Sequence, residues 1–305
     1  MTTLLADIGG THARFALLPE GGAPTAPVKY RLDHFPDIAT AIRQALAGQP
    51  MPRAALLAVA GPVSGNSVTL TNRGWVVDGA ALAPLLGIPR VRVVNDFAAL
   101  AWALPDLAGA DLKPLGGAAA VPGAPMAVLG PGTGLGVAAF LPPGRVLASE
   151  GGHASLAAHT PEEAAVIATL RGQHGHVSAE RLISGMGIEA LHAALGGPPG
   201  LRAAEVTARA LEGGDALSRR ALTMFCALLG SFAGDVALMF GAQGGVFIGG
   251  GICPRFPDFL AASPFRARFE AKGRFQPWLA QVPTWLILRP DPAVLGLAAL
   301  ARQAG

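Results

Sequence analysis

The chain has 305 residues, of which 51% are apolar and 14% are charged, and it contains 41 glycines and 26 prolines. The apolar content excludes a disordered chain, the glycines lack the every-third-residue repeat of collagen, and the length favours two domains. The formal net charge is only +3, and no run of basic residues forms a stripe for a phosphate backbone, so we expect no nucleic-acid partner.

Cysteine use and the apolar stretches indicate the compartment. Cys226 and Cys253 are too few for a four-cysteine metal site or a disulfide framework, and they fit a reducing cytoplasm. Residues 1–7 lack the basic start of a signal peptide. The longest apolar stretch, 221–248, is interrupted by Asp235 and several glycines, so it predicts a buried core helix followed by a strand. We therefore expect a cytoplasmic protein without a membrane partner.

The first hundred residues alternate between strand and helix patterns. Strands at 3–6 and 13–18 flank a glycine turn at 7–11, which predicts a hairpin. The next predicted elements, in chain order, are a helix at 36–47, a buried strand at 54–60, a loop at 61–66, a helix from its cap Asp78 to residue 86, a buried strand at 91–94 and a helix through residue 104. The stretch 105–125, rich in Gly, Pro and Ala, predicts a crossing between domains.

The second part repeats the first hairpin and then becomes mainly helical. A strand at 126–129, a glycine turn at 130–134 and a strand at 135–141 repeat the unit at 3–18, which indicates an internal duplication of architecture. The later predicted elements are a helix from 161 with Thr160 in a Thr-x-x-Glu capping box, a short helix after Ser178, helices at 202–211 and 215–240, a strand at 244–248, a glycine turn at 249–251, a helix near Pro254, a strand at 285–288 and a helix at 292–302. This mixture predicts an α/β chain with a smaller domain at 1–104 plus 291–305 and a larger one at 105–290.

Three glycine turns, at 7–11, 130–134 and 249–251, each follow an apolar strand. Backbone N–H groups can hold a phosphate where no Cβ blocks its approach, and such turns offer that access. The chain has no Walker A loop, G-x-G-x-x-G, G-x-S-x-G or H-E-x-x-H, which disfavours the enzyme classes that these motifs mark. A nucleotide held by glycine hairpins from two duplicated halves is the hypothesis that remains.

Two aspartates stand at strand ends. Asp7, at the first glycine turn, can cap that turn or order Mg²⁺ near a nucleotide through water. After the strand at 91–94, Asn95 or Asp96 can cap the next helix. The carboxyl end of a central strand is also where α/β proteins bind ligands, so Asp96 can instead accept a proton from an attacking hydroxyl.

Acids and histidines recur between residues 150 and 180. Glu150 and His153 flank two glycines in one loop, which is either a plain solvent loop or a grip on neighbouring sugar hydroxyls. Glu180 lies just inside a predicted helix, where it can stabilise the helix dipole. His174 and His176 have no third ligand at metal-like spacing, so we interpret them as surface or helix-end residues.

The order of these motifs along almost the whole chain resembles the bacterial glucokinase family, the non-zinc group with the hexokinase/Hsp70/actin-type fold. The matching stretches are 6–11, 94–97, 132–136, 150–153, 176–180 and 245–252. The resemblance implies a duplicated ribonuclease-H-like fold of two domains, with central mixed sheets and a cleft between the domains. With two cysteines, the chain lacks the zinc motif of the related repressor-type sugar kinases.

The resemblance also implies the roles of the site residues. Asp96 would be the general base for the 6-hydroxyl of D-glucose, and Asp7 would order Mg²⁺ through water. The implied sugar ligands are Asn95, Asp96, Glu150, His153 and Glu180. The implied ATP contacts are Asp7, Gly9, Gly10 and Thr11 in the first phosphate loop, Gly132, Thr133 and Gly134 in the second, and Gly249, Gly250 and Gly251 on the adenine side. A homodimer is implied as well.

Two positions depart from the family pattern, and several alternatives stay open. His12 stands where the family usually has Asn, and Met186 replaces a common Pro. The expected reaction is ATP-dependent phosphorylation of D-glucose at the 6-hydroxyl, although polyphosphate and ADP donors exist among sugar kinases. The alternatives are a kinase of the same fold for another hexose, such as mannose or an amino sugar, a sugar-binding regulator without catalysis, and a chaperone-like or filament ATPase. The last two lack support, because we expect neither a helix-turn-helix segment nor a peptide-binding domain.

Overall fold

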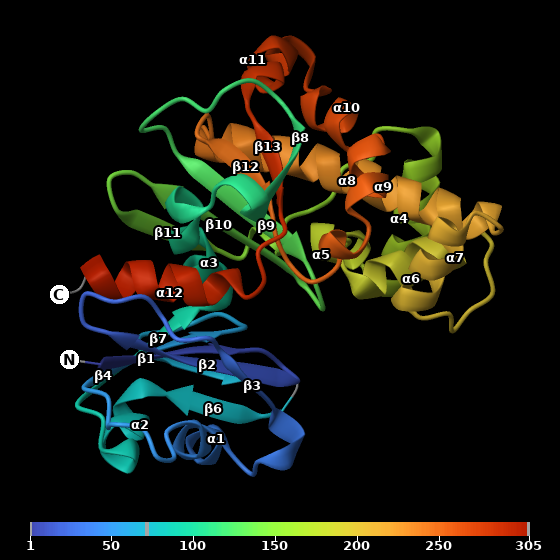
Figure 1. Cartoon of the computed structure of the whole chain (residues 1–305). Helices are drawn as coiled ribbons and strands as arrows, with labels where there is room; N and C mark the ends of the chain where they lie inside the picture. The colour runs from blue at the N-terminus through green and yellow to red at the C-terminus, as the bar shows by residue number, and fades with distance from the viewer. Residues whose placement is uncertain (1, 71–72, 304–305) are drawn as a thin grey trace. The chain divides into compact units, whose positions relative to one another are not determined.

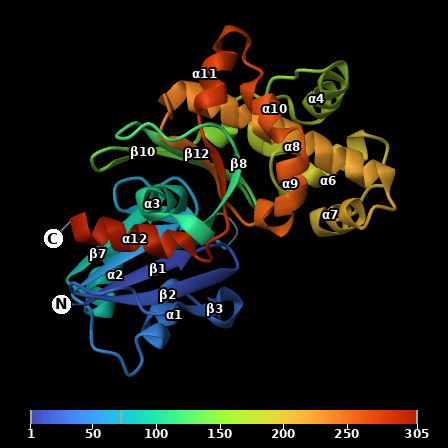
Figure 2. The same cartoon turned by 45° about the horizontal axis from the view of Figure 1, so that its top comes forward.

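The computed structural model describes residues 2–70 and 73–303 and divides the chain into two compact units (Figures 1 and 2). Unit 1 comprises 1–107, 146–148 and 289–305, and unit 2 comprises 108–145 and 149–288. The domain bounds drawn from the sequence remain a proposal beside this division by compactness.

Unit 1 is built on a five-stranded mixed sheet in the order β3–β2–β1–β4–β7. Its strands are β1 (Thr2–Ile8), β2 (His12–Pro19), β3 (Val28–Arg31), β4 (Ala54–Val59) and β7 (Arg90–Asn95). The pair β1–β2 is the predicted antiparallel hairpin, and β1, β4 and β7 run parallel. Because their carboxyl ends share one edge, the residues that follow them are placed at that edge.

Helices cover both faces of this sheet (Figure 1). The helices of unit 1 are α1 (Ile38–Ala45), α2 (Gly79–Leu86), α3 (Asp96–Ala103) and α12 (Pro292–Gln303). Strand alternation sends Leu4 and Ile8 into one core with α1 and α2, and Leu5 and Ala58 into a second core with α3 and α12. A two-stranded ribbon, β5 (Ser67–Leu70) with β6 (Trp75–Asp78), packs on the first core. Asp78 caps α2 as predicted, its side chain accepting from the Ala81 amide.

Unit 2 repeats the same strand order in a six-stranded sheet, β11–β10–β9–β12–β13–β8. Its strands are β8 (Leu112–Gly116), β9 (Met126–Pro131), β10 (Leu135–Leu141), β11 (Arg145–Ser149), β12 (Gly245–Ile248) and β13 (Thr284–Ile287). The hairpin β9–β10 is antiparallel, and β9, β12 and β13 are parallel, as β1, β4 and β7 are. The internal duplication predicted from the two hairpins is therefore confirmed at the level of sheet topology.

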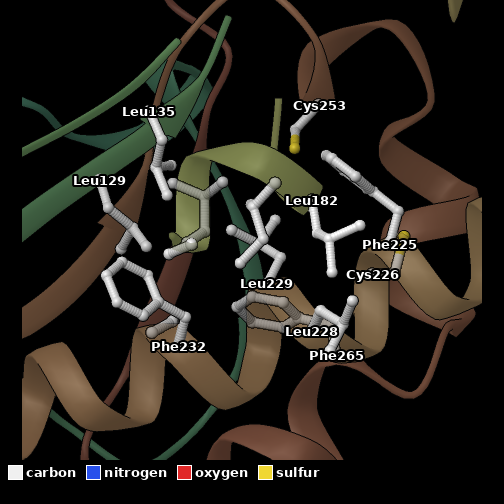
Figure 3. Close-up of a cluster of buried hydrophobic side chains, with 14 of the residues drawn as sticks. Leu129, Leu135, Leu182, Phe225, Cys226, Leu228, Leu229, Phe232, Cys253 and Phe265 are labelled. Carbon is white, nitrogen blue, oxygen red and sulfur yellow. The ribbon is translucent and has the colours of Figure 1, made fainter. Parts of the chain in front are cut away.

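The long helix α8 (Ala216–Phe240) carries the core of unit 2. It packs with α6 (Gly185–Ala194), α7 (Ala203–Glu212) and α10 (Phe265–Glu270), as Figure 2 shows. Figure 3 shows Phe225, Leu229 and Phe232 from this helix among Leu129, Leu135 and other buried side chains. Among the described residues α8 is the one helix long and apolar enough to cross a membrane, and 78% of its apolar window is buried. The prediction of a buried core helix is confirmed.

Some expectations about the elements were incomplete. The stretch 105–125 is more than a crossing, because it contains the edge strand β8, which pairs with β13. The helix near Pro254 is a 3-10 turn, Cys253–Arg255, followed by α9 (Pro257–Ala262). Elements that the sequence patterns did not indicate are β3, β5, β6, β8, β11, α6, α10 and α11 (Gln276–Gln281).

The capping box at α4 (Pro161–His174) has an unexpected form. Thr160 caps the helix as predicted, accepting from the Glu163 amide at 3.1 Å. The Glu163 carboxylate reaches the amide of His159 at 2.8 Å and pairs with Arg268, so it does not bond the Thr160 amide as a reciprocal box requires.

Candidate active site

Asp7 lies inside strand β1, one residue before its end, and not in the glycine turn where the sequence pattern placed it. Its cross-strand partner is Arg14 on β2, and Arg14 Nη1 lies 3.2 Å from Asp7 Oδ2. Arg14 also pairs through Nε with Asp291, which precedes α12. Burial raises the pKa of Asp7, the Arg14 cation opposes that rise, and the Asp291 carboxylate adds to it. The side chain is thus held by an ion pair and does not cap the turn.

The first glycine turn leaves backbone amides for a ligand. Gly9 donates to the His12 carbonyl at 2.9 Å, which closes the turn. Arg73 Nε donates to the Gly10 carbonyl at 2.7 Å and holds the loop from outside. Within 2–70 and 73–303, no group accepts a hydrogen bond from the amides of Gly10 and Thr11. Two unpaired amides in one turn can bind a phosphate oxygen.

His12, the departure from the family pattern, is the first residue of β2, beside this turn. Partial burial and the nearby cations Lys29 and Arg31 lower the pKa of His12. The ring is therefore neutral at pH 7, so it offers one donor and one acceptor and adds no charge to the turn.

Asn95 and Asp96 occupy the junction between β7 and α3, and the structure distinguishes their roles. Asn95 Oδ1 caps α3 by accepting from the Ala98 amide at 3.0 Å, and its Nδ2 donates to the Gly61 carbonyl at 3.1 Å. Asp96 is the first helical residue, and its Oδ1 accepts from the Phe97 amide at 2.9 Å. Of the two candidate caps, Asn95 takes the role, while one N–H of its amide remains available for a further acceptor.

In unit 2 the structure brings Glu150, His153 and Glu180 together. His153 Nε2 lies 4.0 Å from Glu150 Oε2, and its Nδ1 lies 3.9 Å from Glu180 Oε1. The side chains of Glu150 and His153 are more than half exposed, whereas Glu180 is 26% exposed. Two carboxylates on either side of an imidazole form a polar cluster that accepts and donates hydrogen bonds to adjacent hydroxyl groups.

Glu180 is fixed by the second glycine turn and not mainly by a helix dipole. Its helix, α5 (Ala179–Leu182), is a single turn whose N-cap Ser178 makes no side-chain hydrogen bond. Glu180 Oε2 accepts from the Leu135 amide at 2.9 Å, and a Cβ at Gly134 would lie 2.4 Å from that oxygen. Gly134 is therefore required so that the carboxylate can reach the backbone.

The second and third glycine turns pack against each other at the ends of β9 and β12. Gly250 has a φ of +79°, and a Cβ there would meet the Pro131 carbonyl oxygen at 2.4 Å. Gly132 and Gly251, in contrast, have no heavy atom within 4 Å of a Cβ position. Packing thus explains the glycine at 250 but leaves those at 132 and 251 for a role that needs open space, such as the approach of a ligand.

These two turns also present free donors. In the part of the chain that the structure describes, nothing accepts from the amides of Thr133, Gly134, Gly250 and Gly251. Together with the first turn, each of the three predicted phosphate or adenine segments has unpaired N–H groups. Their contacts with ATP remain a prediction.

The donor set for a metal is small. Among the described residues, no group of three His, Cys, Asp or Glu side chains could hold a metal ion, and His174 and His176 are exposed. Asp7 supplies one carboxylate beside a phosphate-type turn. This suits Mg²⁺, which commonly keeps its waters and binds one carboxylate together with substrate phosphates, and it does not suit a metal that needs a protein cage.

Three side chains that shape the site escaped the sequence reasoning: Arg14, Arg73 and Asp291. Arg14 could have been found, because a tight hairpin centred on residues 9–12 pairs position 14 with position 7. The other two come from distant segments, and no local pattern marks them.

Comparison with known proteins places the whole chain. The family model described as Glucokinase matches residues 4–304. A glucokinase of Paramagnetospirillum magneticum is 45% identical, the alignment covering 97% of this chain and 96% of that protein. The crystal structure of a glucokinase from an Antarctic psychrotroph has a TM-score of 0.89 at 37% identity and covers 99% of each chain. A ROK family glucokinase from Streptomyces griseus, solved with glucose and AMPPNP, shares the fold with a TM-score of 0.67 at 22% identity, over 99% of this chain and 100% of that chain.

Proposed function

Because the chain belongs to the glucokinase family, we propose that this glucose-phosphorylating enzyme moves the γ-phosphoryl group of ATP to the 6-hydroxyl of D-glucose with Asp96 as general base. Family membership makes the chain an enzyme, so the non-catalytic regulator and the sugar-independent ATPase are set aside. The observation that carries the role of Asp96 is its place directly after the carboxyl end of β7, where Asn95 has already taken the cap of α3.

The proposed sugar ligands are the polar groups described in each unit. In unit 1, the free N–H of Asn95 donates to a hydroxyl and Asp96 accepts the proton of the attacking one. In unit 2, Glu150, His153 and Glu180 bond further hydroxyls. A sugar lacking one hydroxyl would leave one of these groups unpaired, which is the physical basis of selection.

Phosphoryl transfer needs positioning and charge stabilisation more than covalent chemistry. We propose that the free amides of the three glycine turns hold the ATP phosphates and the adenine side. When bound, Mg²⁺ neutralises charge on the phosphate oxygens, and Asp7 would hold it through water. The Streptomyces griseus structure contains AMPPNP, which supports ATP as donor over polyphosphate or ADP.

The base assignment is tested by Asp96→Asn, which keeps the side-chain shape and removes the proton acceptor. We expect kcat to fall at least ~100-fold, the usual loss for a general base, while calorimetric glucose binding and the melting temperature change little. The exposed Asp106→Asn, on the same unit, is the matched control. Near-normal glucose-dependent ADP production by Asp96→Asn in a coupled assay would refute the role.

Substrate range, assembly and compartment complete the proposal. A panel of glucose, mannose and amino sugars with ATP separates glucokinase specificity from that of a broader hexose kinase: we expect kcat/KM to be highest for glucose. A cytoplasmic homodimer is proposed from the family resemblance. Sedimentation equilibrium tests the dimer directly.

A further inference from the structure

A cavity of about 450 Å³ opens in unit 1 at the amino ends of the parallel strands, and the proposed chemistry does not use it. Its floor follows the sheet register: Leu18, Thr3, Ala54 and Arg90 are consecutive partners across β2, β1, β4 and β7. Paired residues of neighbouring strands point to the same face, so these four side chains line one surface. The volume lies in the range of small-molecule sites, roughly 300–1,000 Å³.

The cavity exists because α12 ends before it covers the whole face. Further along the strands, Leu5 and Ala58 on this face are buried beneath α12 and α3. At the edge where the strands begin, the last turn of α12 supplies a wall through Ala301 and Arg302. The opposite wall is the segment 19–22, and Arg302 donates to the Gly22 carbonyl at 3.3 Å. In Figure 1 the start of β1 and the end of α12 lie at this same edge of unit 1.

The charge of the lining is unbalanced. Three arginines, Arg90, Arg92 and Arg302, face the cavity against one acid, Glu20. The ion pairs of the described part of unit 1 involve Arg14, Arg31 and Arg73 but neither Arg90 nor Arg92. The two strand arginines are exposed and two residues apart on one face, roughly 7 Å along the strand, so one oxyanion can reach both guanidinium groups.

The remaining surface is apolar. Leu18, Ala55 and Leu56 are buried side chains of the lining, and Leu56 is the register partner of Arg92. A ligand that fills this space therefore needs an apolar body as well as a negative group. An inorganic anion would meet the arginines and leave the apolar floor in contact with water.

We propose that this cavity binds a small organic anion, a compound with an apolar body and a phosphate or carboxylate group held by Arg90 and Arg92. The site is separate from the proposed catalytic residues. Arg90 begins β7 and Asn95 ends it, so the two lie about 17 Å apart along one strand. Glucose and ATP are strongly polar, and neither matches the apolar floor.

The test uses phenyl phosphate as probe and isothermal titration calorimetry on the full chain, with glucose and AMPPNP saturating so that the phosphate-binding turns are blocked. We expect saturable binding with a Kd below ~1 mM. Inorganic phosphate and neutral benzyl alcohol should each bind at least ~10-fold more weakly, because each supplies half of the complementarity. Benzoate separates a preference for carboxylate from one for phosphate.

The double variant Arg90→Gln with Arg92→Gln should raise the Kd at least ~10-fold, since each charge-assisted hydrogen bond contributes strongly. Its matched control is Arg171→Gln with Arg209→Gln, two exposed helical arginines of unit 2 with the same change in charge. Because all four side chains are exposed, the variants should fold, and unchanged glucokinase activity verifies it. The control should bind as the unsubstituted chain does.

Three results would overturn the proposal. One is no saturable binding of phenyl phosphate, and a second is equal binding by the double variant. The third is conversion of a dimer to a monomer by the Arg90 and Arg92 substitutions in a chain that binds no probe, which would assign this face to a second copy of the chain.

Discussion

Gly134→Ala should weaken glucose binding without touching any proposed sugar ligand. The new Cβ would lie 2.4 Å from Glu180 Oε2, so the carboxylate has to move. The obstacle is the end of a flexible side chain and not backbone, and no positive φ constrains residue 134, so the fold should survive. The displaced carboxylate loses its 2.9 Å hydrogen bond from the Leu135 amide. That loss should cost stability of about 1 kcal/mol, because Glu180 is partly exposed.

The same displacement removes a charged acceptor from the proposed sugar cluster. One hydrogen bond to a charged group contributes about 1.5 kcal/mol at the lower end of its range, which corresponds to roughly a tenfold change in affinity. We therefore expect the KM for glucose to rise about tenfold, with the KM for ATP within about twofold of its original value. Steady-state kinetics with each substrate varied in turn measures both.

Gly172→Ala provides the control for this prediction, because a Cβ on α4 at that position meets nothing within 4 Å. It should leave both KM values unchanged and slightly stabilise the helix. An unchanged KM for glucose in Gly134→Ala would refute the argument, since it would mean that the Glu180 carboxylate does not hold the sugar in its observed position.

The remaining predictions concern unit 1. Burial raises the pKa of Asp7, so the folded chain holds this proton more tightly than the unfolded chain, and the ionised carboxylate reduces stability at neutral pH. Asp7→Asn should therefore raise the melting temperature at pH 7 while impairing the KM for ATP, and the thermal gain should vanish as the pH falls below about 4; a gain that is independent of pH would contradict this assignment. In Gly296→Ala, the added Cβ would lie 1.8 Å from the Ala99 carbonyl oxygen, so α12 and α3 must separate. Urea denaturation should show a loss of about 3 kcal/mol, and a loss under 1 kcal/mol would show that the two helices adjust freely.

The sequence was informative where one residue type reports a local requirement. Apolar runs and glycine turns predicted both hairpins and the parallel strands, because a buried strand must be apolar along its length and a tight turn favours glycine. Asp78 and Thr160 were recognisable as caps, since capping depends on residues within one helical turn. Short strands such as β5 and β6 escaped, because four half-exposed residues carry too little periodicity to separate a strand from a loop.

The site was predicted residue by residue but not as contacts. That Glu180 would bond the Leu135 amide could not be derived, because 45 residues separate them and only the packing of α5 on the second turn brings them together. Likewise, Asp291 meets Arg14 through the return of the chain after unit 2. Such pairs depend on tertiary topology, which local patterns do not encode.

The discontinuity of unit 1 has a consequence for synthesis. Its sheet is complete once residue 95 has been made, yet the face bearing Leu5 and Ala58 is buried by α12, which the ribosome makes about two hundred residues later. At translation speeds of roughly 5–20 residues per second, that apolar face stays uncovered for about ten seconds or more. Unit 2 can complete its core in that interval. The first segment to emerge is thus the last to mature, and during synthesis the nascent chain should depend on chaperones chiefly through this face.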